Sequence, residues 1–295
     1  MQMRAYVLLT VTALVWGANA VAGKLAVGHV SPLLLTTLRW LLAFCAILPF
    51  AWPHLVRDLP IIRANRIFLL LLGGVGFTGF NAMLYLALNY TSTINVVIEQ
   101  AGMPLIIFLA NFLLLRIAVS PLQFVGFALT LVGVAVTVSR GDLGALIALD
   151  LNRGDALMLL AIVFYGGYTV ALRWKPVLHW MSLMTMLSLG AFLASIPLAV
   201  MEAAAGATIR PDAYGWGIVV FTAILPSLLA QALYIRGNEL IGANRAGLFV
   251  NLVPIFGTIM AVAVVGEALY PFHVAGLALV LGGIALAERS KPAQT

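Results

Sequence analysis

Long apolar stretches separated by short polar breaks run through the whole chain. Stretches of about 20 apolar residues are long enough to cross a bilayer as helices. The pattern predicts ten such spans, at residues 4–27, 32–52, 66–88, 92–115, 121–139, 154–174, 180–201, 213–236, 243–265 and 271–288. A longer polar break at 140–153 is expected to form the central loop. The expected fold is therefore an all-α integral membrane protein with ten transmembrane helices.

The composition agrees with this interpretation. Of the 295 residues, 63% are hydrophobic and 9% are charged, and the mean hydropathy is +1.09. A soluble domain carries about 25% charged residues, so this chain has too few charges to cover a water-exposed surface. The formal net charge of +6 fits loops that face anionic lipid headgroups, and no Lys/Arg-rich run suggests nucleic acid. Cys45 is the single cysteine, which excludes an intramolecular disulfide.

The distribution of Lys and Arg near the span ends predicts the orientation. If the N-terminus is cytoplasmic, the inner loops hold Arg4, Arg57, Arg63, Arg66, Arg116, Arg173, Lys175, Arg236, Arg289 and Lys291. The outer loops then hold Lys24, Arg140, Arg153 and Arg210. Positive residues are enriched in cytoplasmic loops. We therefore expect a multi-pass protein of the cell (inner) plasma membrane with both termini in the cytoplasm.

The sequence contains an internal repeat with a spacing of close to 150 residues. The matched pairs are Pro104 and Pro254, Pro121 and Pro271, Gly126 and Gly276, Gly133 and Gly283, Asn81 and Gln231, and, at a spacing of 149, Trp16 and Tyr165. The match at Trp16 argues against reading the first span as a cleaved signal peptide. Residues 1–142 and 150–295 are thus predicted to be two halves of one membrane domain. Because each half holds an odd number of spans, five, the second half must enter the membrane inverted.

Three segments carry a resemblance to a known family. They are "WGANAVAGK" at 16–24, "LRW" at 38–40, and "NLVPIFGTIMAVAVVGEALYPFHVAGLALVLGGIAL" at 251–286. With the ten spans, these segments resemble the EamA family of the drug/metabolite transporter superfamily. The first half departs from the pattern, since it has "LRIAVSP" where the second has "VGEALYP" with Glu267. Within the family the chain looks most like exporters of the YddG type, which implies export of aromatic amino acids and related metabolites.

Several polar residues lie at one depth in the spans. Asn81 and Glu99 are each seven residues from the short turn that joins the third and fourth spans, or about 10 Å below the outer surface. Tyr85 shares a helix face with Asn81, and Asn95 shares one with Glu99. Arg39 lies at a similar depth in the second span. Arg39 and Glu99 are therefore predicted as an intramembrane ion pair, because such charges often pair inside a bundle.

Each of these charges keeps two interpretations. Glu99 either binds a substrate ammonium group or carries a proton, or it makes a structural hydrogen bond to a neighbouring helix. Arg39 either meets a substrate carboxylate or extends to the lipid headgroups. The repeat places Phe249 at the position of Glu99, so an acid is not required there in both halves. This comparison favours a functional role for Glu99.

A substrate cavity is expected where polar and aromatic side chains of the spans meet. The candidates are Trp16, Asn19, Arg39, Asn81, Tyr85, Asn95, Glu99, Gln100, Phe164, Tyr168, Gln231, Tyr234 and Asn251, with Glu99 also the candidate for proton coupling. The aromatic members can stack on a planar substrate or simply pack between helices. Lys24 and Arg173 are interpreted as interfacial anchors.

The sequence favours a transporter over an enzyme. It offers no spaced His, Cys and carboxylate cluster for a metal, no nucleophile with a base, and no phosphate-binding "GxxxxGK[ST]" motif for ATP. No cofactor is therefore expected. The expected partners are a small amino acid-like substrate and the lipid bilayer, with no nucleic acid, and the chain is expected to act as a monomer. A secondary exporter of small amphipathic metabolites is the first hypothesis, and an exporter of cationic drugs or nucleosides is the alternative.

Overall fold

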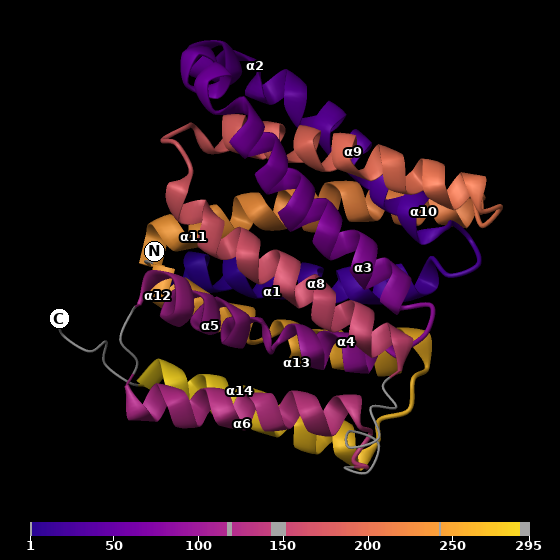
Figure 1. Ribbon diagram of the computed structural model, residues 1–295, viewed down its shortest axis with the longest axis vertical. Coiled ribbons are helices and arrows are strands. Elements are labelled where there is room, and N and C mark those ends of the chain that lie inside the picture. The colour runs from indigo at the N-terminus through magenta and orange to yellow at the C-terminus, as the bar shows by residue number, and fades with distance from the viewer. Residues whose placement is uncertain (1, 117–119, 143–151, 242, 290–295) are drawn as a thin grey trace.

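A computed structural model describes residues 2–116, 120–142, 152–241 and 243–289, and the regular structure in these ranges is helical (Figure 1). In chain order the helices are α1 (Gln2–Leu25), α2 (Pro32–Gly73), α3 (Phe80–Ala87), α4 (Thr93–Gln100), α5 (Met103–Leu115), α6 (Pro121–Val138), α8 (Arg153–Ala171), α9 (Trp180–Ala204), α10 (Ala213–Ile224), α11 (Ala230–Ile241), α12 (Ala243–Val250), α13 (Val253–Met260) and α14 (Pro271–Arg289). Most of the central loop predicted at 140–153 lies outside the described residues.

Much of the described chain is apolar enough to cross a membrane. Seven helical segments have the length and composition of spans, and two shorter apolar helices cover Thr93–Ile107 and Pro271–Ala287. One of the seven, Pro32–Ala87, is 56 residues long. At 1.5 Å per residue that segment would reach about 84 Å if straight, far more than a bilayer core of about 30 Å.

Contacts within this long segment show that it folds back on itself. The rings of Trp40 and Phe77 stack with centroids 4.6 Å apart, although 37 residues of a straight helix would separate them by about 55 Å. Figure 1 shows α2 reversing direction at one edge of the molecule. The prediction of a loop between 52 and 66 was wrong in one respect, because the turn keeps helical hydrogen bonding through Pro49, Pro53 and Pro60. Proline bends a helix by removing a hydrogen bond and crowding the preceding turn.

Two predicted spans are interrupted. The span at 92–115 is divided into α4 and α5 by a break at Ala101 and Gly102. The span at 243–265 is divided into α12 and α13 by a break at Asn251 and Leu252, followed by a π-helical turn at Ala261–Val265. A proline follows each break by two residues, and its missing N–H and its ring both disfavour a continuous helix. The breaks occupy equivalent positions in the repeat.

Irregular turns also recur in both halves. A π-helical turn covers Gly74–Gly79 just before α3, and a second covers Leu225–Leu229 just before α11. These turns coincide at a shift of 150 residues, and each precedes one member of the Asn81 and Gln231 pair. Such turns often occur at functional sites. They change the direction in which the following residues face.

The packing of the helices follows the same duplication. α2 packs against α9 and α6 packs against α14, while α1 contacts α11 and α13 in the way that α8 contacts α3 and α5. In Figure 1 the α6 and α14 pair forms one edge of the molecule and the α2 and α9 pair lies toward the other. The remaining helices, including α1 and α8, lie between these two pairs.

Glycines set the close approach of α6 and α14. A Cβ on Gly126 would lie 2.5 Å from the carbonyl oxygen of Gly283, and one on Gly133 would lie 2.8 Å from that of Gly276. The early glycine of each helix therefore meets the late glycine of the other, so the two helices are antiparallel. Small residues at such contacts allow helix backbones to pack closely inside a membrane.

This contact predicts different effects on stability for substitutions at two neighbouring glycines of α14. Gly283→Ala should lower the free energy of unfolding by about 1–3 kcal/mol, because the new methyl group would overlap the carbonyl oxygen of Gly126. Gly282→Ala is the control, since the nearest atom to its methyl group is Leu129 Cδ2 at 3.9 Å. Thermal unfolding in detergent should separate the two variants. Equal midpoints for both would contradict the close contact.

Candidate functional site: a cavity between the halves

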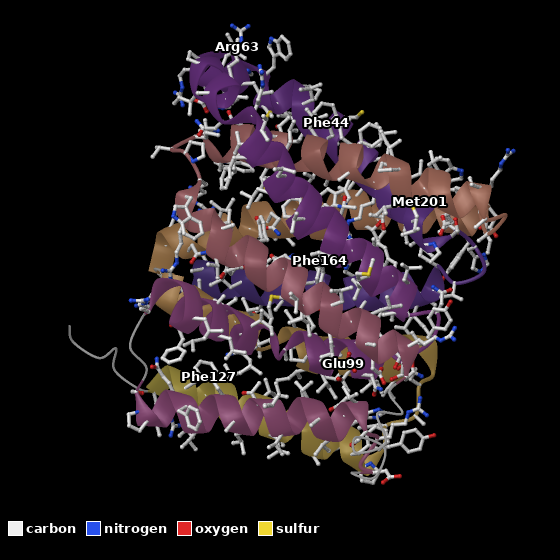
Figure 2. The ribbon with its side chains drawn as sticks, in the orientation of Figure 1. Phe44, Arg63, Glu99, Phe127, Phe164 and Met201 are labelled. Atoms are coloured by element: carbon white, nitrogen blue, oxygen red, sulfur yellow. The ribbon has the colours of Figure 1, made fainter. Side chains whose placement is uncertain are left out.

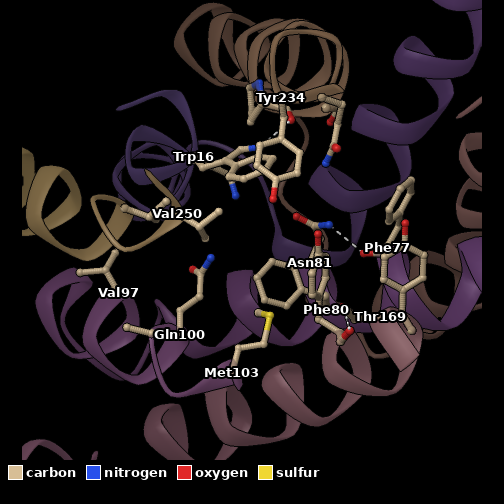
Figure 3. Close-up of a pocket in the computed structure, with 18 of the residues that line it drawn as sticks. Trp16, Phe77, Phe80, Asn81, Val97, Gln100, Met103, Thr169, Tyr234 and Val250 are labelled. Carbon is tan, nitrogen blue, oxygen red and sulfur yellow. Dashed lines mark hydrogen bonds between the residues drawn. The ribbon is translucent and has the colours of Figure 1, made fainter. Parts of the chain in front are cut away.

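A cavity of about 390 Å³ lies between the two halves of the repeat. Its wall is formed by α1, α2, α3, α4 and α5 from the first half and by α8, α11 and the segment around Asn251 from the second. The close-up in Figure 3 shows the side chains of Trp16, Asn81, Gln100, Met103 and Tyr234 around this space. Both helix breaks border it, because Ala101 and Asn251 line the wall.

Arg39 is the cation in the wall of the cavity. Its side chain is only 4% exposed, and neutral groups hold it in place. The Nε atom donates to Ser227 Oγ at 2.7 Å, and Nη1 donates to Asn19 Oδ1 at 2.8 Å and to Asn81 Oδ1 at 2.7 Å. Nη1 also donates to the Tyr85 hydroxyl. These four groups come from both halves and fix the guanidinium plane.

The other terminal nitrogen of Arg39, Nη2, donates no hydrogen bond to any residue in the described ranges. Within the same ranges no carboxylate lies within salt-bridge distance of this guanidinium, and no Asp or Glu lines the cavity. The side chain also lies over the Trp40 ring, with Cζ 5.0 Å from the centroid. A buried cation with a free donor and no counter-ion is costly unless an anion joins it.

Aromatic rings form the rest of the wall. Trp16 and Tyr234 face each other with centroids 5.3 Å apart, and Trp16 Nε1 donates to the carbonyl oxygen of Pro226 at 3.3 Å. Phe77 packs against both Trp40 and Tyr168, with centroid distances of 4.6 and 5.4 Å. Ring faces of this kind favour a planar apolar ligand.

Most of the predicted site residues lie in the wall of this cavity. The nine that do so are Trp16, Asn19, Arg39, Asn81, Gln100, Tyr168, Gln231, Tyr234 and Asn251. The other four, Tyr85, Asn95, Glu99 and Phe164, do not line it. Tyr85 lies behind the wall against Arg39, and Phe164 packs where a Cβ on Gly79 would be.

The predicted ion pair between Arg39 and Glu99 is not formed. Val97 and Gln100 present one face of α4 to the cavity, whereas Asn95 and Glu99 occupy another face. Asn95 binds Asp155 of α8 and His273 of α14 instead. Equal depth in the bundle was predicted from residue counts, but those counts do not give the rotation of a helix about its axis.

Sequence reasoning missed two polar residues in this region. Ser227, which accepts from Arg39 Nε, lies in the π-helical turn directly after Pro226. Asp155 lies in the "NRGD" segment, which reads as a loop but which largely belongs to α8. The proline before Ser227 and the acid inside the first turn of an apolar run were the available signals.

Part-buried hydrogen bonds tie the helices together at one end of the bundle, which we call the closed end. Glu267 accepts hydrogen bonds from the backbone N–H groups of Thr93 and Ile94, at 2.7 and 3.0 Å, and so caps α4 from the second half. Gly266 before it has a φ of 76°, a left-handed conformation that favours glycine. Glu202 caps α2 in the same way, through Leu33 and Leu34.

Lys24 belongs to this closed end as well. Its Nζ donates to the carbonyl oxygens of Leu88 and Thr91 at 2.8 and 2.9 Å. The side chain therefore ties α1 to the turn between α3 and α4, in place of the interfacial anchoring that the sequence suggested. The cavity lies away from this end, since it extends to Leu172, beyond the last turn of α8.

In the described ranges, a helical bundle with long apolar segments and a largely aromatic cavity that holds a buried arginine is typical of a multi-pass membrane protein of the transporter class. The comparison with protein families agrees and is more specific. The chain belongs to the EamA-like transporter family, whose model matches twice, at residues 3–139 and 152–288. It is thus a member of a transporter family and not an enzyme.

Curated relatives match along nearly the whole chain. The uncharacterized transporter YetK of Bacillus subtilis (strain 168) is 26% identical over 287 residues, covering 96% of this chain and 86% of its own. The uncharacterized transporter YyaM of the same organism is 26% identical over 289 residues, covering 96% and 93%. An uncharacterized transporter of Archaeoglobus fulgidus is 27% identical, covering 97% of this chain and 98% of its own. A crystal structure that is 19% identical shares the fold, with a TM-score of 0.62 over 97% of this chain and 98% of that one.

Proposed function

We propose that this protein is a secondary transporter that exports small amphipathic metabolites bearing a carboxylate, with aromatic amino acids as the first candidates. The observation that carries the proposal is Arg39. Its buried guanidinium is held by neutral groups and keeps Nη2 free at the cavity wall. A substrate carboxylate supplies the missing counter-ion and accepts that donor.

The rest of the cavity suits the remainder of such a molecule. A volume of about 390 Å³ lies within the range of small-molecule sites. The rings of Trp16, Trp40, Phe77 and Tyr234 provide faces for an aromatic side chain. An ammonium group would meet carboxamide oxygens and ring faces, both of which bind cations without a full counter-charge.

The same observations disfavour the alternative substrates. A cationic drug would bring a second positive charge close to Arg39, and no Asp or Glu in the described wall would offset it. A nucleoside could stack on the rings but would leave the Arg39 charge without a partner. Like-charge contacts and buried unpaired charges both reduce affinity.

We also propose the finer architecture of ten transmembrane helices in two inverted halves, residues 1–142 and 150–295, within one membrane domain. The reversal of α2 supports counting Pro32–Ala87 as two crossings rather than one. The antiparallel glycine contacts of α6 and α14, which are equivalent helices of the repeat, support the inversion. Two halves of this kind can rock about a central site and open it to alternate sides.

The proposed orientation places both termini in the cytoplasm of a cell whose plasma membrane holds the protein. The excess of Lys and Arg in the loops on that side supports it. The start of α1 and the end of α14 also lie at the same edge of the bundle in Figure 1. In this orientation the closed end is the outer one, and the cavity can load substrate from the cytoplasm.

Counterflow in liposomes tests the proposed function. Purified protein should exchange labelled L-phenylalanine or L-tryptophan against unlabelled substrate in the lumen. Phenylpropionate, which keeps the carboxylate, should compete, whereas phenethylamine, which keeps only the amine, should compete at least tenfold less because it leaves Arg39 without an anion. Aliphatic amino acids, a nucleoside and a quaternary ammonium drug complete the panel.

The outcomes of this substrate panel either support or overturn the proposed substrate class. Exchange that requires the carboxylate supports the proposal, and the ranking of side chains then measures the contribution of the aromatic wall. Exchange of phenethylamine or of the quaternary ammonium drug in preference to the carboxylates would overturn it. Protein-free liposomes and protein denatured before reconstitution provide the controls for leakage.

A further inference from the structure

Two buried carboxyl groups lie next to each other at the closed end, away from the cavity. Glu99 belongs to α4 in the first half and Asp155 to α8 in the second, and both side chains are 0% exposed. Asn95, one turn before Glu99 on the same face of α4, donates to Asp155 Oδ1 at 3.3 Å, so both carboxyl groups lie in the contact between α4 and α8. Figure 2 labels Glu99 on α4 in the layer between α8 and the α6 and α14 pair.

Several oxygens of the two carboxyl groups lack a hydrogen-bond donor. Asp155 Oδ1 accepts from the Thr91 hydroxyl and from Asn95 Nδ2, the latter at 3.3 Å. No donor among the described residues reaches either oxygen of Glu99 or Asp155 Oδ2. A carboxylate can only accept, so two ionised groups would leave three buried acceptors unpaired and two like charges in contact. One shared proton removes the charge repulsion and joins two of these three oxygens in a hydrogen bond.

The repeat shows that the fold does not require acids at this contact. At shifts of 150 and 149 residues, Glu99 falls on Phe249 and Asp155 falls on Tyr6. Those two residues also meet, as an aromatic pair with centroids 5.4 Å apart. One contact between halves is thus an ordinary ring pair, and its equivalent at the opposite end is a pair of acids. If these two contacts only held the halves together, a ring pair would be sufficient at each of them.

The titratable groups on the elements packed against α4 have hydrogen-bond partners other than Glu99. From α1, Lys24 donates to backbone carbonyl oxygens, and before α14, Glu267 accepts from the N-terminal amides of α4. α14 contributes His273, whose Nε2 is 3.0 Å from Asn95 Oδ1. α6 and α13, which also pack on α4, bring no titratable side chain in their described ranges. None of these groups neutralises Glu99.

We propose that Glu99 and Asp155 form a single proton site that couples export to the movement of protons into the cell. This inference rests on the proposed transport function and adds its energy source. With one proton the two carboxyl groups bind each other and hold α4 to α8, which keeps the outer end closed. Without it both groups are ionised and repel, which favours opening of that end. The proton enters from outside, closes the outer end, and leaves toward the open inner side.

Both members of the site bridge the two halves, so proton binding and closure are linked. Whatever stabilises the closed outer end must raise the affinity for the proton by the same factor. Thr91 and Asn95 orient Asp155, and His273 orients Asn95 through the contact described above. These three are positioning residues, since they contact the acids or their partner and carry no exchanged proton in this scheme.

Transport driven by a pH gradient tests the proton site. Liposomes with a lumen one pH unit more acidic than the bath, and with the membrane potential clamped, should accumulate the best counterflow substrate about tenfold for one proton exchanged per molecule. Glu99→Gln and Asp155→Asn should lose this accumulation and retain downhill counterflow. Glu202→Gln is the matched control, because Glu202 is a buried acid at the same end whose oxygens are all bonded to donors.

The two proposals fail in different ways. Absence of counterflow in the unaltered protein would overturn the proposed function. Normal counterflow with no response to the pH gradient, or accumulation driven by a sodium gradient instead, would overturn the proton site alone. Loss of gradient-driven accumulation in Glu202→Gln to the same extent would also overturn it.

Infrared spectroscopy of the unaltered protein tests the proton site even if the substituted variants fail to fold. The infrared spectrum of the unaltered protein in lipid should contain the C=O stretch of one protonated, water-inaccessible carboxyl group at neutral pH. Glu99→Gln or Asp155→Asn should remove that band, and Glu202→Gln should keep it. A neutral-pH spectrum without any protonated carboxyl band would contradict the proposal regardless of transport.

Discussion

Arg39→Gln is expected to reduce exchange of carboxylate substrates by on the order of 100-fold. Removing one partner of a buried charge pair costs about 2–5 kcal/mol, and each 1.4 kcal/mol is a factor of ten. The loss should fall on substrate affinity, because in the proposed site the guanidinium binds the substrate carboxylate, while only neutral groups surround it in the structure. Stability should change little, because removal of a buried charge without a counter-ion offsets the loss of its hydrogen bonds to Ser227, Asn19 and Asn81.

The measurement is the concentration dependence of counterflow, with thermal unfolding in parallel. Arg39→Lys is the control for charge, and it should retain part of the affinity, because an ammonium group attracts a carboxylate but lacks the planar fork. Phenethylamine exchange should not decrease in Arg39→Gln. A variant that melts at a much lower temperature, or that keeps its affinity for carboxylates, would show that Arg39 serves the fold rather than the substrate.

Asn19→Asp is expected to inhibit the same exchange by the opposite change in charge. Asn19 Oδ1 already accepts from Arg39 Nη1 at 2.8 Å, so an aspartate there would form an internal ion pair. The pair would compete with the substrate carboxylate for the guanidinium, and we expect a loss of affinity on the order of 100-fold. Thermal stability should rise by about 1–3 kcal/mol, because an ion pair replaces a hydrogen bond between the Arg39 cation and a neutral acceptor.

Comparison with Asn19→Ala separates charge from contact. That variant removes the acceptor without adding a carboxylate, so it should lose stability and keep the preference for anionic substrates. Counterflow and thermal unfolding on both variants provide the measurement. If Asn19→Asp exports carboxylates normally, then Arg39 does not bind them, and the substrate assignment is wrong.

The sequence predicts the duplicated framework well because the framework depends on strong local signals. Apolar length, and a proline or glycine at fixed spacing, identified the helices and the equivalence of Pro104 and Pro254. The breaks at these prolines were visible in the sequence but were read as continuous spans. Helical geometry through Pro49, Pro53 and Pro60 could not be foreseen, since it depends on the contact between α2 and α9.

The site was predicted only in part, because residue counts give depth along a helix but not its rotation. Depth along a helix follows from counting residues, and it gave Arg39 and Asn81 similar depths; in the structure these two side chains are hydrogen-bonded. Rotation about the helix axis is fixed by packing, and it turned Glu99 toward Asp155 and away from Arg39. Asp155 itself was hidden in a segment that resembles a loop, because Arg153 and Gly154 precede it at the start of α8.

The break at Ala101 and Gly102 has a mechanical consequence. It leaves α4 as a rigid arm of 8 residues, or about 12 Å, with one end at the cavity and the other at the end of the bundle where Glu267 caps it. A tilt of about 20° would displace the far tip by about 4 Å while the near end hardly moved. A gate of this kind can open without moving α5, so the cavity can stay assembled while its exit changes.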